Sequence, residues 1–216
     1  MLHFLDNHDE QRLASREFAG TPEKGKPMMV VSATISSSPT MIYFGQEVGE
    51  DGKENAGFGT HSRTSIFDYV GVPHHQRWMN GGKFDGGQLS ENEKTLRDFY
   101  QRLLNFSLKS DALMDKFQEI QTINRNETIA YDPGIYSYVR WTAKEKLIVV
   151  ANFSWVTTSS FELKIPAEVI KAWNIKDGLY DVKDQLYGST AQLKVADGKG
   201  TIQLKVKPSE SFIFKV

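Results

Sequence analysis

The sequence predicts an α/β segment followed by an antiparallel all-β domain. In the first half, short continuous apolar runs alternate with helical patterns, as in buried parallel strands covered by helices. From about residue 117 the apolar period changes to two, and turn residues separate the short strands. This second pattern predicts a β-sandwich. The change falls near residues 109–117, so we place the domains at 1–112 and 113–216.

The α/β segment opens with an apolar run, residues 2–5, that leads directly into Asp6-Asn7-His8-Asp9. A buried parallel strand delivers polar groups at its carboxyl end in this way. We expect a short helix over 12–18 and an apolar helix over 27–35 with Pro27 in its first turn. Residues 41–44 are predicted to form a second buried parallel strand.

A long glycine-containing connection, residues 45–89, precedes the clearest helix signal in the chain. Ser90 and Glu93 form a capping box, in which each side chain binds a backbone amide at the helix start. Apolar residues then recur at helical spacing and predict an amphipathic helix with one buried stripe. The stripe comprises Leu96, Phe99, Tyr100, Leu103 and Leu104.

The second half contains several segments of alternating apolar and polar residues. We predict one hairpin from 135–141 and 146–153, a strand at 161–165, a short helix at 166–173, a second hairpin from 192–195 and 202–206, and a last strand at 211–216.

Composition narrows the functional class. The formal net charge is −1, so no basic surplus favours nucleic acid or an acidic membrane as a partner. No apolar window approaches a membrane span. The chain has no cysteine, which excludes disulfides, thiolate nucleophiles and cysteine-ligated zinc. We expect no secretory signal at the start of this chain, and its compartment stays open.

Four features resemble, in order, the α-amylase superfamily of glycoside hydrolases. Phe4-Leu5-Asp6-Asn7-His8-Asp9 is similar to the strand-seven motif, and Pro39-Thr40-Met41-Ile42-Tyr43-Phe44-Gly45-Gln46-Glu47 to strand eight. Arg63-Thr64-Ser65-Ile66-Phe67-Asp68-Tyr69 looks like a loop beside the substrate cleft, and the sandwich matches the C-terminal domain. The resemblance implies the C-terminal portion of such an enzyme: the last two units of a (β/α)8 TIM-type barrel, then a β-sandwich.

The resemblance also implies roles for single residues. Asp9 matches the aspartate that stabilises the transition state, and His8 matches a histidine that binds the same sugar ring. An oxocarbenium-like transition state gains from anionic groups that grip hydroxyls beside the reacting ring. Arg12 and Arg63 match positions that contact the substrate or support the residues that do. The alternative is that Asp9 caps a helix and His8 is structural.

The two carboxyl groups that perform the reaction in this family have no match in the chain. A retaining glycosidase needs a nucleophile and an acid/base about 5–5.5 Å apart. Asp6, Glu10 and Glu47 are the carboxylates near the expected barrel mouth, and none matches either role. We therefore expect the isolated chain to be inactive on its implied partner, an α-glucan or oligosaccharide.

No cofactor or metal ligand is predicted. Glu50-Asp51-Gly52-Lys53-Glu54-Asn55 lacks the order of acidic residues in a calcium loop and is interpreted as a solvated loop. The residues thus do not support the calcium site that the resembling family can carry. His74 and His75 lack the spacing of a zinc helix and are interpreted as loop residues.

Three functional hypotheses remain open: a fragment of an enzyme, one subunit of a split enzyme, and a non-catalytic glucan-binding module. The third depends on aromatic rings in the sandwich, of which Trp155 is the best exposed candidate for stacking on sugar. For the first two, a pair of barrel strands leaves open edges. We therefore expect self-association or an N-terminal partner chain that completes the barrel.

Overall fold

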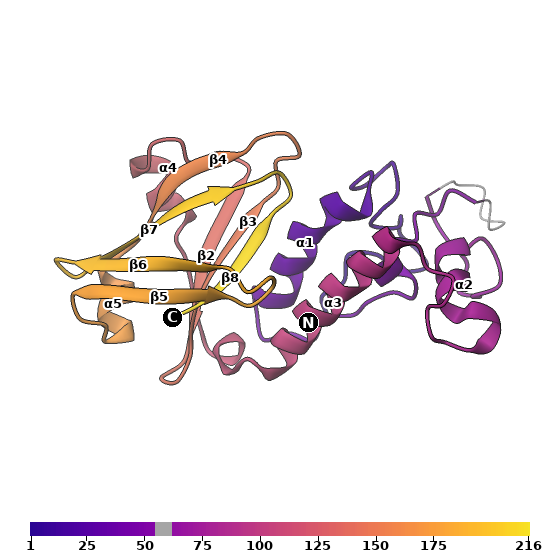
Figure 1. The fold of residues 1–216 in the computed structure, drawn as a ribbon, viewed down its shortest axis with the longest axis horizontal. Coiled ribbons are helices and arrows are strands. Elements are labelled where there is room, and N and C mark those ends of the chain that lie inside the picture. The colour runs from indigo at the N-terminus through magenta and orange to yellow at the C-terminus, as the bar shows by residue number, and fades with distance from the viewer. Residues whose placement is uncertain (55–61) are drawn as a thin grey trace. The chain divides into compact units, whose positions relative to one another are not determined.

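The computed structural model describes residues 1–54 and 62–216 and divides the chain into two compact units. The N-terminal unit comprises Met1–Ala33 and Ser38–Leu104, and the C-terminal unit comprises Thr34–Ser37 and Asn105–Val216. Figure 1 labels the elements of both. The assignment of 1–112 to a barrel and 113–216 to a sandwich domain stays a prediction.

Short helices and turns dominate the N-terminal unit. Its helical elements are α1 (Pro22–Thr34), η1 (Gln46–Val48), α2 (Pro73–Met79), η2 (Asn80–Gly82) and α3 (Glu91–Lys109), of which Thr34 and the end of α3 from Asn105 are assigned to the C-terminal unit. The expected start of α1 at Pro27 is wrong. Pro22 occupies the first turn, and the Thr21 hydroxyl accepts a hydrogen bond from the Lys24 amide at 3.4 Å, as an N-terminal cap does. Residues 12–18 form turns instead of the expected helix.

The two parallel strands expected at 2–5 and 41–44 are not formed as strands. One parallel bridge joins His3 to Thr40. The His3 amide donates to the Pro39 carbonyl at 2.9 Å, and the Met41 amide donates to the His3 carbonyl at 2.8 Å. These bonds reproduce the pairing direction of neighbouring barrel strands. A barrel strand is paired with other strands along both of its edges, whereas the strand pairing of these segments within the described residues is limited to this one bridge. The barrel units of the predicted fold are therefore not shown.

The amphipathic helix is confirmed as α3. The Ser90 amide donates to Glu93 Oε2 at 2.7 Å, and the Glu93 amide donates to the Ser90 hydroxyl at 3.4 Å, which completes the capping box. Leu96, Phe99, Tyr100 and Leu103 are buried. Gln46 Nε2 donates to the Tyr100 hydroxyl at 3.1 Å, so the stripe also satisfies a buried amide.

Eight antiparallel strands form the C-terminal unit, in the spatial order β1-β2-β3-β8-β5-β6-β7-β4. They are β1 (Lys116–Glu119), β2 (Ile135–Trp141), β3 (Lys146–Asn152), β4 (Ser159–Ile165), β5 (Gly178–Asp184), β6 (Thr190–Ala196), β7 (Lys199–Val206) and β8 (Ser211–Lys215). The helical elements of this unit are η3 (Asp111–Met114), α4 (Gln121–Glu127) and α5 (Ala167–Trp173). Both predicted hairpins, the strand at 161–165 and the short helix are confirmed.

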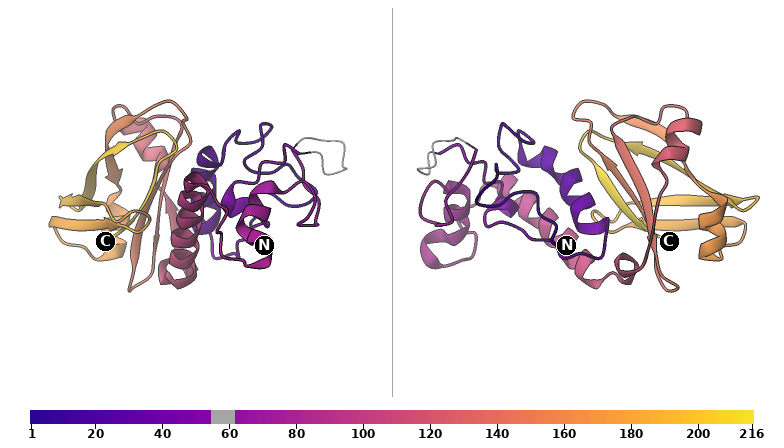
Figure 2. Two further views of the ribbon diagram at one scale, coloured as in Figure 1. Left: turned by 45° about the vertical axis from the view of Figure 1, so that its right-hand side comes forward. Right: turned by 180° about the vertical axis from the view of Figure 1, so that it is seen from behind.

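The predicted β-sandwich would consist of two separate sheets. The structure instead has one continuous, curled sheet. Its two four-stranded halves, β1-β2-β3-β8 and β5-β6-β7-β4, join through a short pairing of Lys183 and Asp184 with Lys215 and Phe214. Figure 2 shows the strands of this unit curving around their interior. Because so few residues hold the halves together, the sheet can fold over its own core in the manner of a sandwich.

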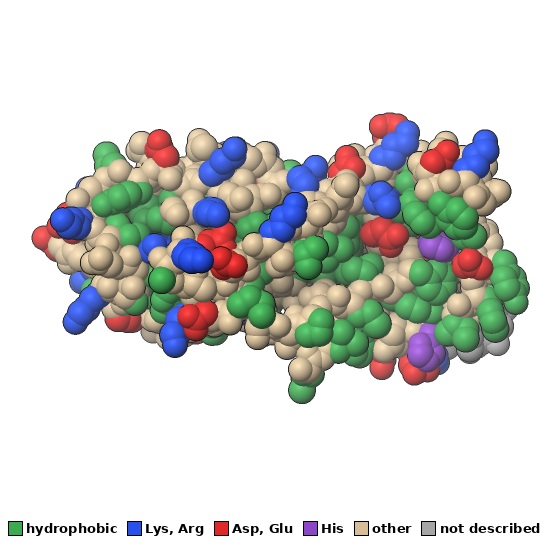
Figure 3. Space-filling model, turned by 90° about the horizontal axis from the view of Figure 1, so that it is seen from below, with side chains coloured by type: hydrophobic (Ala, Val, Ile, Leu, Met, Phe, Trp, Pro, Cys, Tyr) green, Lys and Arg blue, Asp and Glu red, His purple; other side chains and the backbone are tan. Residues whose placement is uncertain are grey.

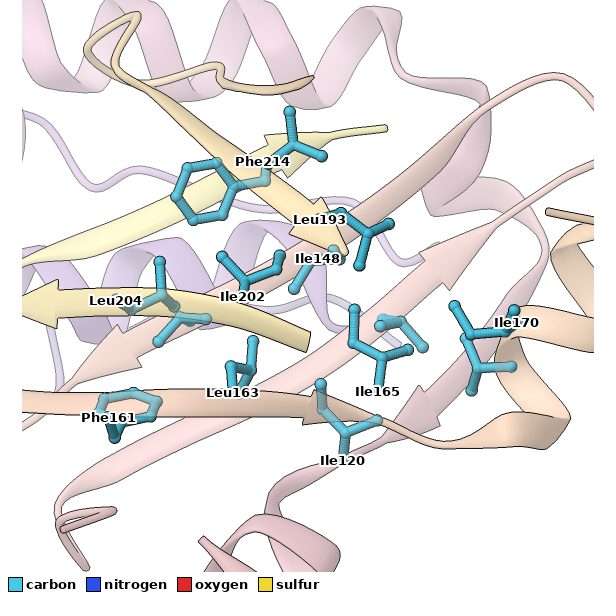
Figure 4. Packing of buried hydrophobic residues seen from close by; sticks show 14 of the residues in the cluster. Ile120, Ile148, Phe161, Leu163, Ile165, Ile170, Leu193, Ile202, Leu204 and Phe214 are labelled. Atoms are coloured by element: carbon cyan, nitrogen blue, oxygen red, sulfur yellow. The ribbon is translucent and has the colours of Figure 1, made fainter. Parts of the chain in front are cut away.

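One apolar cluster fills the curled sheet. Figure 4 shows Phe161, Leu163 and Ile165 along β4, with Ile202 and Leu204 of β7 in the same cluster. Ile148 of β3 and Phe214 of β8 belong to it as well, so both halves of the sheet contribute to one core. The period-two pattern of the sequence is the direct cause, since alternate residues of each strand point into this interior.

Candidate functional site

His8, Asp9 and Arg63 meet at the surface of the N-terminal unit. His8 Nε2 lies 3.4 Å from Asp9 Oδ2, and the two side chains are 55% and 71% exposed. The Arg63 guanidinium donates to the His8 carbonyl at 3.2 Å and lies 3.7 Å from Asp9 Oδ1. The structure therefore brings together three residues that the resemblance singles out, although Arg63 is far from the other two in sequence.

Local backbone bonds present this group to solvent. The Asn7 side-chain oxygen accepts hydrogen bonds from the amides of Asp9 at 2.7 Å and Glu10 at 3.0 Å. This Asx turn reverses the chain just after the His3 bridge. The Arg12 amide donates to the Ser62 carbonyl at 2.6 Å, which brings the residue before Arg63 against the same turn.

Arg12 itself is fully buried, and its guanidinium binds groups of the protein. Nη2 donates to the Phe44 carbonyl at 2.6 Å and Nη1 to the Thr64 hydroxyl at 3.3 Å. Its charge lies 3.4 Å from Asp6 Oδ2 and 4.6 Å from the centre of the Tyr43 ring. The structure thus places Arg12 as a support that ties together three segments, and its role at a sugar site stays a prediction.

Asp6 is the partner that the sequence did not reveal. Its Oδ2 accepts the Leu13 amide at 2.9 Å, and the side chain has no exposure. Burial raises the pKa of Asp6 because it penalises the charged form, and the attraction to Arg12 opposes that rise. Residues 6–12 form neither a helix nor a strand, so no regular period predicts that Asp6 and Arg12 pair.

Two exposed aromatic rings follow Arg63 in the chain. Phe67 and Tyr69 stack with centroids 5.5 Å apart and an angle of 30° between their planes. They are 52% and 69% exposed. The Ser65 hydroxyl accepts the Phe67 amide at 2.9 Å, and the Tyr43 hydroxyl donates to the Ser65 carbonyl at 3.1 Å. A flat apolar face of this kind suits the apolar side of a sugar ring.

Trp155 lies in the C-terminal unit after β3 and is 47% exposed. The turn that carries it is held by Asn152 and Ser154: Asn152 Oδ1 accepts the Ser154 amide at 2.9 Å, and the Ser154 hydroxyl accepts the Thr157 amide at 3.0 Å. Trp173, by contrast, is 4% exposed and packs in the core.

Two interpretations of the segment after η1 need correction. Glu50 and Asp51 are 1% and 9% exposed, so they do not belong to a solvated loop. Asn55, the last residue of the calcium-like pattern, lies outside the described residues. His74 and His75 stand in the first turn of α2 instead of a loop. Glu50, Asp51 and His74 each offer one ligand atom, and these atoms lie within 4.8 Å of one another.

Neither a protein-family model nor a curated protein matches the sequence. Solved structures do match in fold. An α-amylase from Geobacillus thermoleovorans, complexed with acarbose, gives a TM-score of 0.62 at 13% identity, over 100% of this chain and 38% of that one. A maltogenic α-amylase from Thermotoga neapolitana gives 0.61 at 16% identity, over 99% and 40%.

A third α-amylase, from H. orenii, gives a TM-score of 0.56 at 16% identity, over 99% of this chain and 39% of that one. The chain therefore spans about 40% of the length of the structures that it matches. None of the helices in the described residues has the length and apolar character needed to cross a membrane. The chain shares the fold of a part of the α-amylase enzymes, consistent with the C-terminal fragment that the motifs imply.

Proposed function

We propose that the chain is the C-terminal portion of an α-amylase-type glycoside hydrolase and that His8, Asp9 and Arg63 form one wall of its sugar site. The convergence of these three polar side chains at the surface carries the proposal. The fold likeness supports it. Among the similar structures, one named AmyP is solved with maltotriose and the Geobacillus thermoleovorans enzyme with acarbose.

In this proposal each residue has a distinct task. The Asp9 carboxylate accepts hydrogen bonds from sugar hydroxyls and stabilises the positive charge that develops on the ring in the transition state. His8 binds the same ring. Arg63 fixes the segment through the His8 carbonyl, and its guanidinium lies beside the Asp9 carboxylate. Phe67 and Tyr69 offer a stacking face for a neighbouring sugar.

Cleavage of the glycosidic bond needs two carboxyl groups for which this chain offers no candidates. Double displacement requires a nucleophile and an acid/base about 5–5.5 Å apart. Asp6 forms a buried ion pair with Arg12. Neither Glu10 nor Glu47 matches the nucleophile or the acid/base of the family. In the proposed parent enzyme both groups come from the remaining strands of the barrel. The isolated chain should accordingly bind sugar without turning it over.

Sugar binding by the 216-residue chain is the direct test. We expect maltotriose to bind weakly, because one wall of the site is present, and Asp9→Asn to weaken binding about tenfold through loss of a charge-assisted hydrogen bond. Chemical-shift changes in an NMR titration would measure both affinities. The matched control is Glu10→Gln, which removes the neighbouring exposed carboxylate and should leave the affinity unchanged.

Equal losses in the Asp9 and Glu10 variants would show that only general negative charge matters and would contradict the proposal. Equal affinity for cellotriose, whose linkages are β, would contradict the specificity for α-glucans. Measurable release of glucose or maltose from maltotriose by the pure chain would contradict the expected inactivity.

The exposure of Trp155 favours a second function, glucan binding by the C-terminal unit without catalysis. If Trp155 stacks on sugar, Trp155→Ala should abolish retention on insoluble starch, since loss of one stacking ring removes most of the contact area. Tyr187→Ala is the matched control, because Tyr187 is also exposed in this unit, at 53%. Unchanged retention of the Trp155 variant would exclude this function.

Completion of the barrel by another chain or a second copy also remains a proposal. Figure 3 shows hydrophobic side chains gathered on the face that the N-terminal unit presents in that view. The exposed apolar residues of this unit include Leu2, Phe4, Phe18, Ile66, Phe67, Tyr69 and Phe84. Apolar surface beside a single strand bridge is what a barrel segment leaves uncovered.

A further inference from the structure

We propose that Glu50, Asp51 and His74 bind a divalent transition-metal ion of the zinc type. The three residues come from two segments of the N-terminal unit, the end of the turn after η1 and the first turn of α2. Their ligand atoms lie within 4.8 Å of one another. The proposal is independent of sugar binding, since none of these residues belongs to the His8, Asp9 and Arg63 group.

Glu50 supplies the first independent argument. The residue is 1% exposed, and its Oε2 accepts the backbone amides of His74 at 3.0 Å and His75 at 3.3 Å. Its second oxygen, Oε1, is buried and has no hydrogen-bond partner among the described residues. An unsatisfied buried carboxylate oxygen is costly. A cation beside Oε1 would remove that cost.

His74 is oriented as a metal-binding histidine is. Its Nδ1 lies 2.8 Å from Glu93 Oε1, so Nδ1 carries the proton and the lone pair of Nε2 is left for a metal. Arg77 Nη2 donates to Glu93 Oε1 at 2.6 Å and the Ser90 hydroxyl donates to Glu93 Oε2 at 2.7 Å, so the carboxylate is held in place. Glu93 in turn holds the His74 ring, as carboxylates behind metal-binding histidines do.

The donor set selects the kind of metal. Two carboxylates and an imidazole suit zinc and its neighbours in the transition series, whereas calcium takes only oxygen ligands. Tetrahedral zinc would need ligand atoms about 3.3 Å apart, so any two of these atoms that are now farther apart would have to close around the ion. His74 is 26% exposed, which leaves a path for the ion. Lys53 is largely exposed, and its Nζ lies 2.5 Å from Asp51 Oδ2. The metal ion would displace this ammonium group from Asp51.

Metal binding would stabilise the structure of the N-terminal unit. The ion would tie the turn after η1 to α2, close to Arg12. The turn at Gly45 packs tightly against Glu50, His75 and Arg12. A Cβ atom added to Gly45 would lie 3.1 Å from Glu50 Cβ and from His75 Cβ, and 3.3 Å from Arg12 Nη2. We therefore assign the ion a stabilising role in the N-terminal unit and none in the glycosidase reaction.

The test is zinc binding by the chelator-treated 216-residue chain, measured by calorimetry, with cobalt absorption as a report on coordination. We expect one equivalent of Zn²⁺ to bind, a rise in Tm, and no comparable effect of Ca²⁺. Glu50→Gln and His74→Gln should each weaken binding by at least tenfold, and Glu93→Gln by about 10–100-fold although it does not touch the metal. Lys53→Ala should tighten binding.

His8→Gln is the matched control, because His8 also has a neighbouring carboxylate but is exposed. Zinc affinity that is lost in the His8 variant and retained in the Glu50 and His74 variants would mean adventitious surface binding and would overturn the proposal. Undetectable binding at millimolar Zn²⁺ would overturn it as well. Circular dichroism of the metal-free variants establishes that each is folded, so a loss of affinity reports on the ligands themselves.

Discussion

Arg12→Leu should lower the free energy of unfolding of the N-terminal unit by about 3–5 kcal/mol at neutral pH, because it leaves the buried Asp6 carboxylate without its counter-charge. It also removes the guanidinium bonds to Phe44 and Thr64. Hydrogen exchange measured peptide by peptide can report this unit separately from the C-terminal one.

The penalty should depend on pH in a defined direction. Burial raises the pKa of Asp6 in the folded state, and removing Arg12 takes away the attraction that opposes the rise. The folded Arg12→Leu protein then binds a proton more readily than the unfolded chain, so its stability increases as the pH falls through the raised pKa. The destabilisation relative to the native sequence should therefore shrink as the pH is lowered from neutrality.

Two variants separate the ion pair from general packing. Asp6→Asn combined with Arg12→Leu should recover part of the loss and abolish its pH dependence, since no charge is left to bury. Arg16→Leu, an exposed arginine four residues away, should change the stability by less than about 0.5 kcal/mol. A loss in the Arg12 variant that is no larger than in the Arg16 variant would refute the buried ion pair as a stabilising element.

Asn124→Asp should destabilise the C-terminal unit by about 3–5 kcal/mol. Asn124 Nδ2 donates to the carbonyls of Ile120 at 2.7 Å and Lys164 at 2.9 Å. Its Oδ1 accepts the Lys164 amide at 2.8 Å and the Thr128 hydroxyl at 3.0 Å. Two of these four bonds join the fully buried Asn124 amide to Lys164 and so fasten α4 to β4, and the other two bind Ile120 and Thr128 at the ends of α4 itself. Aspartate would turn an oxygen toward two carbonyls and bury a charge.

Denaturant unfolding followed by circular dichroism would measure this loss, which should diminish in acid as the new carboxyl group becomes protonated. Asn126→Asp, an exposed site on the same helix, is the control and should cost less than about 1 kcal/mol. Similar losses at both positions would mean that helix propensity, not the buried bonds, is responsible.

The parts of the fold that depend on local sequence were predictable. The capping box and apolar stripe of α3 are set by residues within one or two turns of each other, and the structure confirms them. The hairpin between β6 and β7 follows from a turn at Asp197 and Gly198, which adopt positive φ values of 51° and 70°. The start of α1 differs from the prediction because Thr21 and Pro22 supply the cap and first turn, although Pro27 also suits the first turn of a helix.

The parts that depend on distant neighbours were not predictable. The segments at 2–5 and 41–44 read as strands, yet a strand forms only where partners hold its edges, and these segments share one bridge. β5 was missed because much of it is exposed and its apolar alternation is weak. The burial of Arg12 and of Glu50 is likewise decided by segments far away in sequence.

By itself, the sequence determined the candidate sugar-binding pair, His8 and Asp9, and the antiparallel class of the second half. The pair rests on a resemblance carried by contiguous residues and stays a prediction, whereas the antiparallel class follows from a regular period of two. Only the tertiary structure decided that Arg63 joins the pair, that Arg12 is buried with Asp6, and that Glu50, Asp51 and His74 meet. The physical reason is that charges separated in sequence are brought together, and buried or exposed, by the packing of the chain between them.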